Sequence, residues 1–253
     1  MYLIVTRSFP PELGGMQNLL WGLSKELSKN FMIKVFADYF EGHKDFDEQA
    51  SFSIERVGGI KLLRKYRKAQ LINEFIKENK IKGIIADHWK SLELIKTSKN
   101  KYCLIHSKEI NHPKGSSQNK RVVSVLNNVE KVIANSEYTK NLAIDCGVNE
   151  NKIIVINPGV DVAREIDKKT LNKVESLLKV KTPRLITVSR FDKRKNHEKI
   201  IMALRNLKQI YPDIVYICVG FGEEEKNIKK LVKELDLEAQ VMFFKDISSN
   251  LKN

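Results

Sequence analysis

The chain has 253 residues and a formal net charge of +14, because 45 Lys and Arg stand against 31 Asp and Glu. Hydrophobic residues make up 42% and charged residues 30%, a globular balance that excludes general disorder. At roughly 150 residues per domain, this length indicates between one and two domains. No apolar run approaches the roughly 18–20 residues that span a bilayer, and the N-terminal apolar stretch ends before Arg7, which excludes a signal peptide. We therefore expect a cytoplasmic protein.

Ten short apolar runs are predicted strands. Seven of them are Tyr2–Thr6, Met32–Ala37, Ser53–Val57, Ile81–Ala86, Tyr102–His106, Val129–Ala134 and Ile153–Ile156. A second set consists of Arg184–Ser189, Ile214–Gly220 and Val241–Phe244. Most runs are apolar on both faces, as parallel strands buried under helices are. Amphipathic stretches between them predict helices, one of which follows Asn196 with an apolar face of Ile200, Met202–Leu204, Leu207 and Ile210.

The alternation of strands and helices predicts an α/β fold with parallel sheets. It breaks once, at residues 157–182, where a turn leads into a polar and weakly periodic stretch. We therefore predict a first domain at residues 1–165 and a second at 166–253. Only three strands follow the break, so the second domain is expected to be incomplete.

The three cysteines are Cys103, Cys146 and Cys218, which stand far apart and form no CxxC pair. Each lies in or beside an apolar segment, so we expect buried small hydrophobes rather than a zinc site or a disulfide framework. Three histidines also lack metal-ligand spacing: His43, His88 and His197. We expect no bound metal.

A double glycine, Gly14-Gly15, follows the first strand and a proline-containing loop, and precedes an amphipathic helix. Glycines let the backbone approach a ligand closely, and a helix N-terminus offers free N–H groups and positive potential. The arrangement fits a pyrophosphate seat, although a tight turn has the same sequence. It is neither a GxGxxG nor a P-loop motif.

Two further strand ends carry polar residues. After the strand that begins at Arg184, a loop holds four cations, among which Arg190 fits bidentate phosphate binding and Lys195 a point charge. The alternative is a solvated basic loop. His106 ends a buried strand at its carboxyl end, where open α/β sheets bind ligands. The alternative for His106 is a hydrogen-bonding group that merely terminates the strand.

A basic segment opens the helix that is predicted from residue 61 to about residue 79. Its cations include Arg64, Lys65, Arg67 and Lys68, interleaved with large apolar residues. Such a helix fits an anionic membrane surface, and the alternative is an ordinary sheet-covering helix with a solvated basic face.

Four segments in order resemble the retaining glycosyltransferases of the GT-B fold, group 1 or family 4, and among them the phosphatidylinositol mannosyltransferase-like members. The segments are FPPELGGMQNLLWGLSKEL, IANSEYTKNLAIDCGVNENKIIVINPGVD, TVSRFDKRKNHEKIIMAL and ICVGFGEEEKNIKKLVKELDLEAQVMFF. Their order and spacing agree with the family over essentially the whole chain. The resemblance implies an acceptor-side Rossmann-like domain at residues 1–165 and a partial nucleotide-sugar donor domain at 166–253.

The resemblance also implies site roles. Gly14 and Gly15 would approach the donor diphosphate, Arg190 and Lys195 would hold it from the second domain, and His106 would contact the transferred sugar near the reacting carbon. The donor is a nucleotide-diphosphate sugar, which is a substrate, and no cofactor or metal is implied. The expected acceptor is a glycolipid, saccharide or other envelope component, with the protein peripheral on the inner face of the cell membrane.

Two departures from the family stand out. The family's later E-x7-E segment, whose acids bind the sugar and the ribose, has no match here, and the usual glycine of its RKG sequence is Asn196. An alternative is therefore a truncated or split glycosyltransferase that is catalytically incomplete without a further segment or a partner. A basic nucleic-acid-binding module is a remote alternative, because no helix-turn-helix, RNP-like or zinc-finger pattern is present. A dinucleotide-dependent oxidoreductase lacks its GxGxxG sequence.

Overall fold

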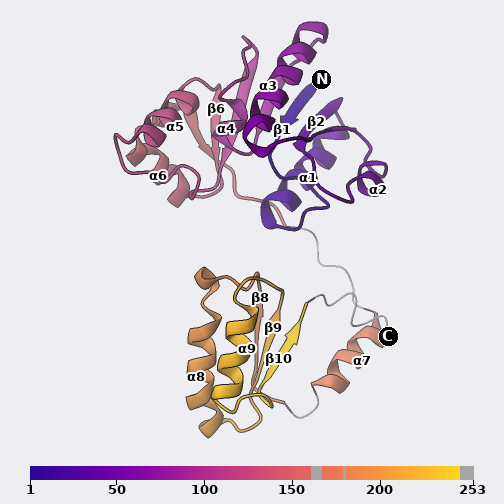
Figure 1. Cartoon of the computed structure of the whole chain (residues 1–253), viewed down its shortest axis with the longest axis vertical. Coiled ribbons are helices and arrows are strands. Elements are labelled where there is room, and N and C mark those ends of the chain that lie inside the picture. The colour runs from indigo at the N-terminus through magenta and orange to yellow at the C-terminus, as the bar shows by residue number, and fades with distance from the viewer. Residues whose placement is uncertain (161–166, 179–180, 246–253) are drawn as a thin grey trace. The chain divides into compact units, whose positions relative to one another are not determined.

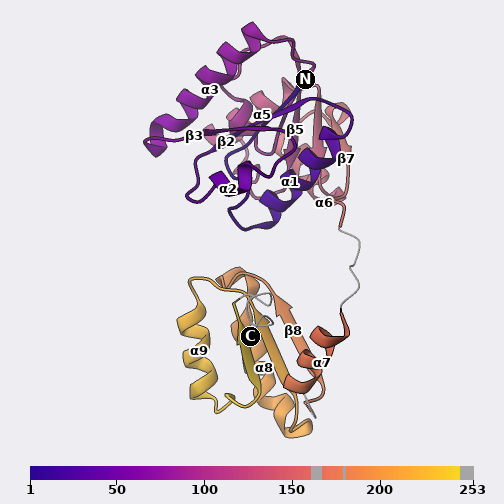
Figure 2. The same cartoon turned by 90° about the vertical axis from the view of Figure 1, so that its right-hand side faces the viewer.

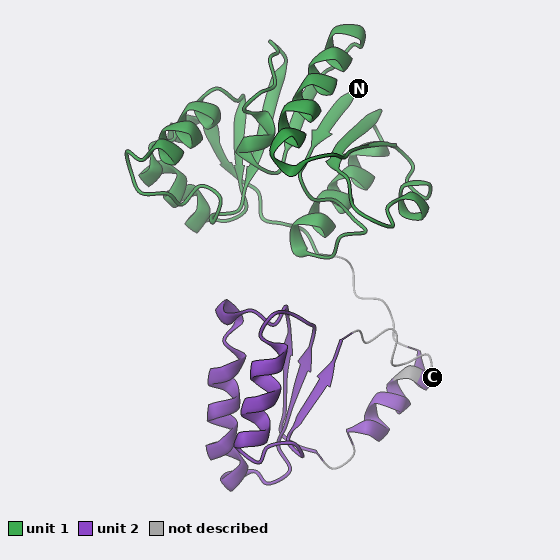
Figure 3. Cartoon of the chain, viewed as in Figure 1, with its two compact units in different colours: residues 1–161 green, residues 162–253 purple. Residues whose placement is uncertain are grey.

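The structure, a computed structural model, describes residues 1–160, 167–178 and 181–245. The chain forms two compact units, residues 1–161 and 162–253 (Figure 3). The sequence places the change of domain at residues 165/166, within a few residues of this division. Each unit has its own parallel sheet and its own hydrophobic core.

The first unit contains a seven-stranded parallel sheet in the order β3-β2-β1-β4-β5-β6-β7. Its strands are β1 Tyr2–Val5, β2 Ile33–Asp38, β3 Ser53–Val57, β4 Gly83–Ala86, β5 Asn100–Ile105, β6 Lys131–Ala134 and β7 Ile153–Val155. The strand order reverses direction between β1 and β4. This is the doubly wound arrangement of Rossmann-like sheets, which confirms the predicted fold class.

Helices cover both faces of this sheet (Figures 1 and 2). They are α1 Gly15–Ser28, α2 Lys44–Asp47, α3 Lys61–Glu78, α4 Trp89–Leu92, α5 Ser117–Asn127 and α6 Glu137–Cys146, with a 3-10 turn at Glu150–Lys152. Alternation along β1 explains why both faces need cover, because Leu3 and Val5 pack into one cluster and Ile4 into another. The cluster around Ile4 includes Leu20 of α1. The cluster around Leu3 and Val5 includes Ile72 of α3 and residues of α4 and α5.

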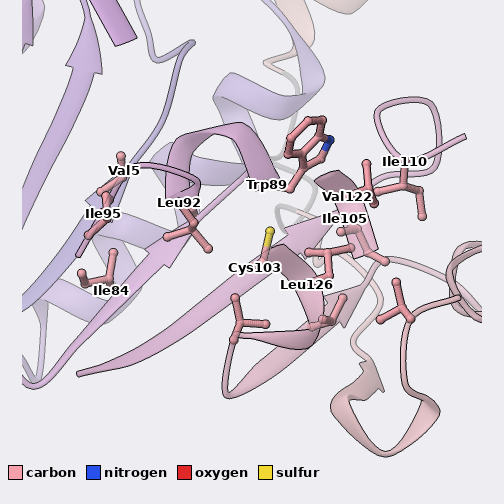
Figure 4. Close-up of a cluster of buried hydrophobic side chains, with 14 of the residues drawn as sticks. Val5, Ile84, Trp89, Leu92, Ile95, Cys103, Ile105, Ile110, Val122 and Leu126 are labelled. Atoms are coloured by element: carbon pink, nitrogen blue, oxygen red, sulfur yellow. The ribbon is translucent and has the colours of Figure 1, made fainter. Parts of the chain in front are cut away.

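The larger of these clusters forms the main core of the first unit (Figure 4). Trp89, Cys103, Ile105, Val122 and Leu126 are all fully buried in it. Cys146 and Cys218 are also buried and all three thiols are free, so the sequence-based expectation for the cysteines is confirmed.

The second unit has a three-stranded parallel sheet in the order β10-β9-β8. Its strands are β8 Arg184–Val188, β9 Val215–Val219 and β10 Val241–Phe244. Helices α8 His197–Ile210 and α9 Glu225–Glu234 pack on one face, and α7 Lys168–Leu177 lies on the other (Figures 1 and 2). This is half of a doubly wound sheet, as the sequence predicts.

Two local expectations differ from the structure. The polar stretch at residues 157–182 contains the helix α7, whose short apolar face packs on the sheet through Val174 and Leu178. In α8, Met202 and Ile210 are 48% and 69% exposed, whereas His197 and Leu204 are buried. The buried face therefore shares Leu204 with the predicted face, with Ile200 and Leu207 partly buried beside it, but it is centred on His197, Ile201 and Leu204 and leaves Met202 and Ile210 in solvent.

No helix in residues 1–160, 167–178 or 181–245 has the length and apolar content needed to cross a membrane.

Lys68 is not available to a membrane surface, so this part of the sequence-based prediction is wrong. Its side chain is buried on the sheet-facing side of α3, beside Ala69 and Ile72. Its Nζ donates to Asp38 Oδ1 at 2.6 Å and also to the Thr6 carbonyl. Burial lowers the pKa of Lys68, and the Asp38 carboxylate opposes that shift.

Arg64 is only half exposed, because it shares the carboxylate of Asp38 with Lys68. Its Nη1 lies 3.5 Å from Asp38 Oδ2, and its Nη2 donates to the Gly59 carbonyl at 3.0 Å. Lys65 and Arg67 are exposed. Of the four predicted membrane contacts, these two point most freely into solvent.

The contrast between Lys68 and Lys65 gives a stability test. We expect Lys68→Ala to lower the free energy of unfolding by about 3 kcal/mol, because it leaves Asp38 without its shorter ion pair and the Thr6 carbonyl without its donor. Lys65→Ala, three positions away on the same helix, should change it by no more than about 0.5 kcal/mol. Chemical denaturation of both variants measures the difference. Equal effects would show that the buried pair does not stabilise the first unit.

Candidate functional site

The carboxyl ends of β1, β4 and β5 meet at one edge of the first sheet. β1 and β4 are neighbours across the reversal of strand order, and β5 follows β4. Where the strand order reverses, the loops after the two neighbouring strands leave the sheet in opposite directions. Open α/β sheets bind their ligands at this place, at the carboxyl ends of the strands. The structure brings the Gly14-Gly15 segment after β1 and His106 after β5 to this same edge.

The loop between β1 and α1 is anchored at two points. Phe9 is buried and its ring meets the ring of Trp21 edge-on at 6.1 Å. The Pro10 carbonyl accepts from Arg56, which is itself held by both carboxylate oxygens of Asp47 at 2.6 and 2.9 Å. These contacts therefore hold in place the loop that leads to Gly14 and Gly15.

Helix α1 begins at Gly15, with Gly14 as its N-cap residue and no side chain in the capping position. A Cβ added at Gly15 would meet nothing within 4 Å, whereas one at Gly14 would lie 2.3 Å from Gln17 Oε1. The space above Gly15 is thus open, and the first amides of α1 lack a side-chain acceptor. This is the geometry in which a helix N-terminus receives an anion.

His106 follows β5 directly and is half-buried. Its main-chain N–H donates to the carboxylate of Glu109, which holds the turn. Its ring Nε2 is buried and has no hydrogen-bond partner among the described residues. Burial lowers the pKa of His106 to about 4, so the ring is neutral at pH 7.

Asp87 and His88 extend this edge at the end of β4, although no motif in the sequence predicts a role for them. Asp87 is 4% exposed, accepts from Thr6 Oγ1 at 2.7 Å, and burial raises its pKa to about 6. His88 Nδ1 accepts from the Lys90 amide at 3.0 Å, and burial, followed by the charge of Arg7, lowers its pKa to about 3. The sequence contains a pattern that could have predicted this position, because two polar residues directly follow a predicted buried strand.

Cations surround these groups. Lys90 Nζ and the Arg121 guanidinium lie 5.1 and 5.2 Å from the Trp89 ring centre, and Arg121 pairs with Glu93 at 2.7 and 2.8 Å. Burial, and then the charges of Arg7 and Arg121, lower the pKa of Lys90. Neither Arg7 nor Lys90 has an ion pair within the described ranges. Arg7 and Lys90 are therefore the cations of this edge that the described structure leaves without an ion pair.

In the second unit, Arg190 and Lys195 lie on one loop that starts at the carboxyl end of β8. Both side chains are exposed, and neither forms an ion pair in the part of the chain that the structure describes. Asp192 Oδ1 accepts from the Lys195 amide at 3.2 Å and caps the 3-10 turn Lys193–Lys195. The structure thus presents the two predicted phosphate-binding cations together.

Asn196 has φ 57°, in the left-handed region, at the start of α8. Asn adopts this conformation more readily than other residues with a side chain. The replacement of the family's usual glycine by asparagine is therefore compatible with the loop, and Lys195 keeps its place.

Across the described residues, no group of three or more His, Cys, Asp or Glu side chains has the geometry to hold a metal ion.

The chain is similar to known glycosyltransferases over its whole length. It is 23% identical over 257 residues to the GDP-mannose-dependent alpha-(1-6)-phosphatidylinositol monomannoside mannosyltransferase of Mycolicibacterium smegmatis, covering 97% of this chain and 67% of that protein. The crystal structure of Anabaena HepE in complex with UDP and glucose has a TM-score of 0.78 and 22% identity, covering 97% and 70%. A glycosyltransferase from Rickettsia africae has a TM-score of 0.75 and 19% identity, covering 99% and 69%.

These structures show that the fold is of the GT-B type, with the second unit partial. The family model described as Glycosyltransferase Family 4 matches residues 13–164, which is more than half of the chain. The model described as Glycosyl transferases group 1 matches residues 168–253. The resemblance found in the sequence is confirmed: the chain belongs to glycosyltransferase family 4.

Proposed function

We propose that the chain supplies the acceptor domain and the diphosphate-binding part of the donor site in a retaining hexosyltransferase that uses a nucleotide-diphosphate sugar. The observation that carries this proposal is the placement of Arg190 and Lys195, exposed and unpaired in the described structure, on one loop at the carboxyl end of β8. Two named relatives support the donor class, since one is GDP-mannose-dependent and the HepE crystals contain UDP-glucose.

In this reaction the two cations act by electrostatics. As the bond between the sugar and the diphosphate breaks, negative charge grows on the leaving oxygens, and fixed cations and helix-terminal amides stabilise it. Arg190 and Lys195 are the cations of the second unit that fit this role, and the open N-terminus of α1 at Gly15 is the helix-terminal group of the first unit that fits an anion. His106, neutral and half-buried at the end of β5, is the side chain that we propose to contact the transferred sugar.

A second candidate is a chain that binds the donor but transfers sugar only when another segment or a partner completes the donor domain. One observation favours it. On β8, Ile186 and Val188 are 62% and 70% exposed, although their neighbours on β9 are covered by α7. Apolar residues on an edge strand are normally covered or paired. Sugar transfer by the purified 253-residue chain alone would contradict this candidate.

We further propose that the start of α3 contacts an anionic membrane surface or a lipid acceptor. Apolar side chains here are strongly exposed: Ile60 is 70%, Leu62 81% and Leu63 60% exposed. Lys65 and Arg67 stand beside them, also exposed. Apolar and cationic side chains exposed together on one helix end fit the boundary between lipid headgroups and acyl chains.

The donor proposal has a direct test. We expect Arg190→Ala combined with Lys195→Ala to weaken binding of UDP and GDP sugars by about 100-fold or more, because each charge-assisted contact contributes about 1.5–3 kcal/mol. Isothermal titration calorimetry measures both nucleotides. The matched control is Lys199→Ala with Arg205→Ala, which removes the same charge from exposed positions on α8. If the two double variants bind equally, or if the parent chain binds neither nucleotide sugar, the donor proposal fails.

His106 gives a pH-dependent test. With a folded pKa of about 4 and an unfolded value near 6.5, the folded chain binds fewer protons than the unfolded chain between these values. His106 therefore makes stability rise with pH across that window. We expect His106→Asn to reduce this rise, as measured by denaturant unfolding at pH 4.5 and 7. A difference between the parent and the variant that is the same at both pH values would contradict the assignment.

The membrane proposal is tested by charge reversal at the exposed cations alone. Lys65→Glu with Arg67→Glu should weaken co-sedimentation with phosphatidylglycerol-containing vesicles at least roughly tenfold, since each surface cation contributes about 1 kcal/mol. Lys226→Glu with Lys230→Glu on α9 makes the same change in net charge and should have no such effect. Vesicles of phosphatidylcholine alone provide the uncharged reference. Equal sedimentation of both variants with the anionic vesicles would reject the proposal.

A further inference from the structure

His197, the first residue of α8, is 2% exposed and uses both ring nitrogens. Its Nδ1 lies 2.8 Å from the Tyr216 hydroxyl, and its Nε2 lies 3.1 Å from the Ser189 hydroxyl. The Tyr216 hydroxyl in turn donates to Thr187 Oγ1 at 3.0 Å. The four side chains form one buried chain of hydrogen bonds from the sheet to the loop that carries Arg190.

The protonation state of this chain follows from its partners. Burial lowers the pKa of His197, so the ring is neutral at pH 7 and has one donor and one acceptor. Because the Tyr216 hydroxyl donates its proton to Thr187, Nδ1 carries the ring proton and donates to Tyr216. Nε2 is then the acceptor that faces the Ser189 hydroxyl at 3.1 Å, and the proton of that hydroxyl is shared with the Arg190 carbonyl at 3.2 Å. A neutral histidine therefore completes both bonds.

The same loop is held from a second side by the turn after β9. The Phe191 amide donates to the Phe221 carbonyl at 2.9 Å, and the Glu224 amide donates to the Phe191 carbonyl at 3.0 Å. A Cβ at Gly220 would lie 2.0 Å from the Ser189 carbonyl oxygen, and one at Gly222 2.4 Å from that of Phe191. The two loops therefore touch backbone to backbone, which only glycine allows.

The Phe191 ring adds a further contact between this loop and the histidine. It is 1% exposed and meets the ring of His197 edge-on at 4.8 Å. Arg190 thus stands between two anchored residues, Ser189 and Phe191, while its own side chain is exposed. Lys195 stands two residues before His197.

We propose that His197 is a positioning residue, which fixes the main chain of residues 189–197 so that Arg190 and Lys195 are held ready for an anionic diphosphate; this rests on the proposed function. Fixing the loop in advance reduces the ordering cost that two long cationic side chains would otherwise meet on binding. A ring that only filled space would need no partner on either nitrogen, whereas His197 joins β9 to the β8–α8 loop through both.

The test is a double-mutant cycle on the 253-residue chain, with UDP and GDP as probes. We expect Ser189→Ala and His197→Phe each to raise the Kd for the nucleotide about tenfold, and the double variant to raise it no further, because both remove the same link. His197→Gln places an amide near the position of Nε2 and should restore most of the affinity. Additive effects, or no rescue by glutamine, would overturn the proposal.

A structural control separates positioning from stability. Gln240 is also buried in the second unit and bonds to the Pro212 carbonyl at 3.4 Å, at the start of β10 and away from the loop. Gln240→Ala should lower the unfolding temperature without changing the nucleotide Kd, because it leaves a cavity and leaves the Pro212 carbonyl without its donor. If His197→Phe behaves in the same way, its role is only structural and the proposal is wrong.

A second readout does not depend on any nucleotide. In His197→Phe, the Phe191 and Lys195 amides should exchange hydrogen at least roughly tenfold faster than in Gln240→Ala, because the loop loses one of its two anchors. Unchanged exchange would overturn the positioning role. If the parent chain binds neither UDP nor GDP, the donor proposal fails, and the exchange result alone decides the role of His197.

Discussion

Parallel strand pairing determines where the polar residues of this chain lie. Every strand of both sheets runs in the same direction as its neighbours, so each sheet has one edge at which all of its strands end. Buried strands leave no room for charge along their length, and the chain changes from apolar to polar where it leaves the sheet. Gly15, His88, His106 and Arg190 all follow strand ends for this reason.

Burial is the second constraint, because it sets the charge state of the groups at this edge. The rings of His88 and His106 are neutral at pH 7, and the Arg7 side chain at the same edge reaches solvent. The long side chains of Arg7 and Lys90 thus lie around neutral histidines at this edge. Much of the +14 net charge of the chain lies elsewhere and serves as ordinary solvated surface.

The strands could be predicted from the sequence because apolar runs of this length leave few alternatives. Their ends differ from the structure by no more than two residues, as at β4, which begins at Gly83 instead of Ile81. The direction of individual long side chains could not be predicted in this way. Lys68 is a basic residue like its exposed neighbours, and only the fold shows that its ammonium binds the Asp38 carboxylate of β2.

His197 was missed for the opposite reason. It has no metal-ligand spacing, so its pattern indicated no chemistry, and the predicted apolar face of α8 did not include it. Yet it stands four and seven positions before Ile201 and Leu204, which are both fully buried. A polar residue in phase with a buried face is a signal that sequence reasoning can use, since such a residue needs partners. The partners themselves, Ser189 and Tyr216, become visible only in the structure.

The two tryptophans of the chain, Trp21 and Trp89, both lie in the first unit. The Trp89 indole is fully buried, donates its Nε1–H to the Glu109 carbonyl at 2.8 Å, and has two cations over its ring. Because the Lys90 ammonium lies over the Trp89 ring, a change in the position or charge of Lys90 alters the electric field at the indole. Tryptophan fluorescence therefore reports on the first unit alone, because the second unit contains no tryptophan.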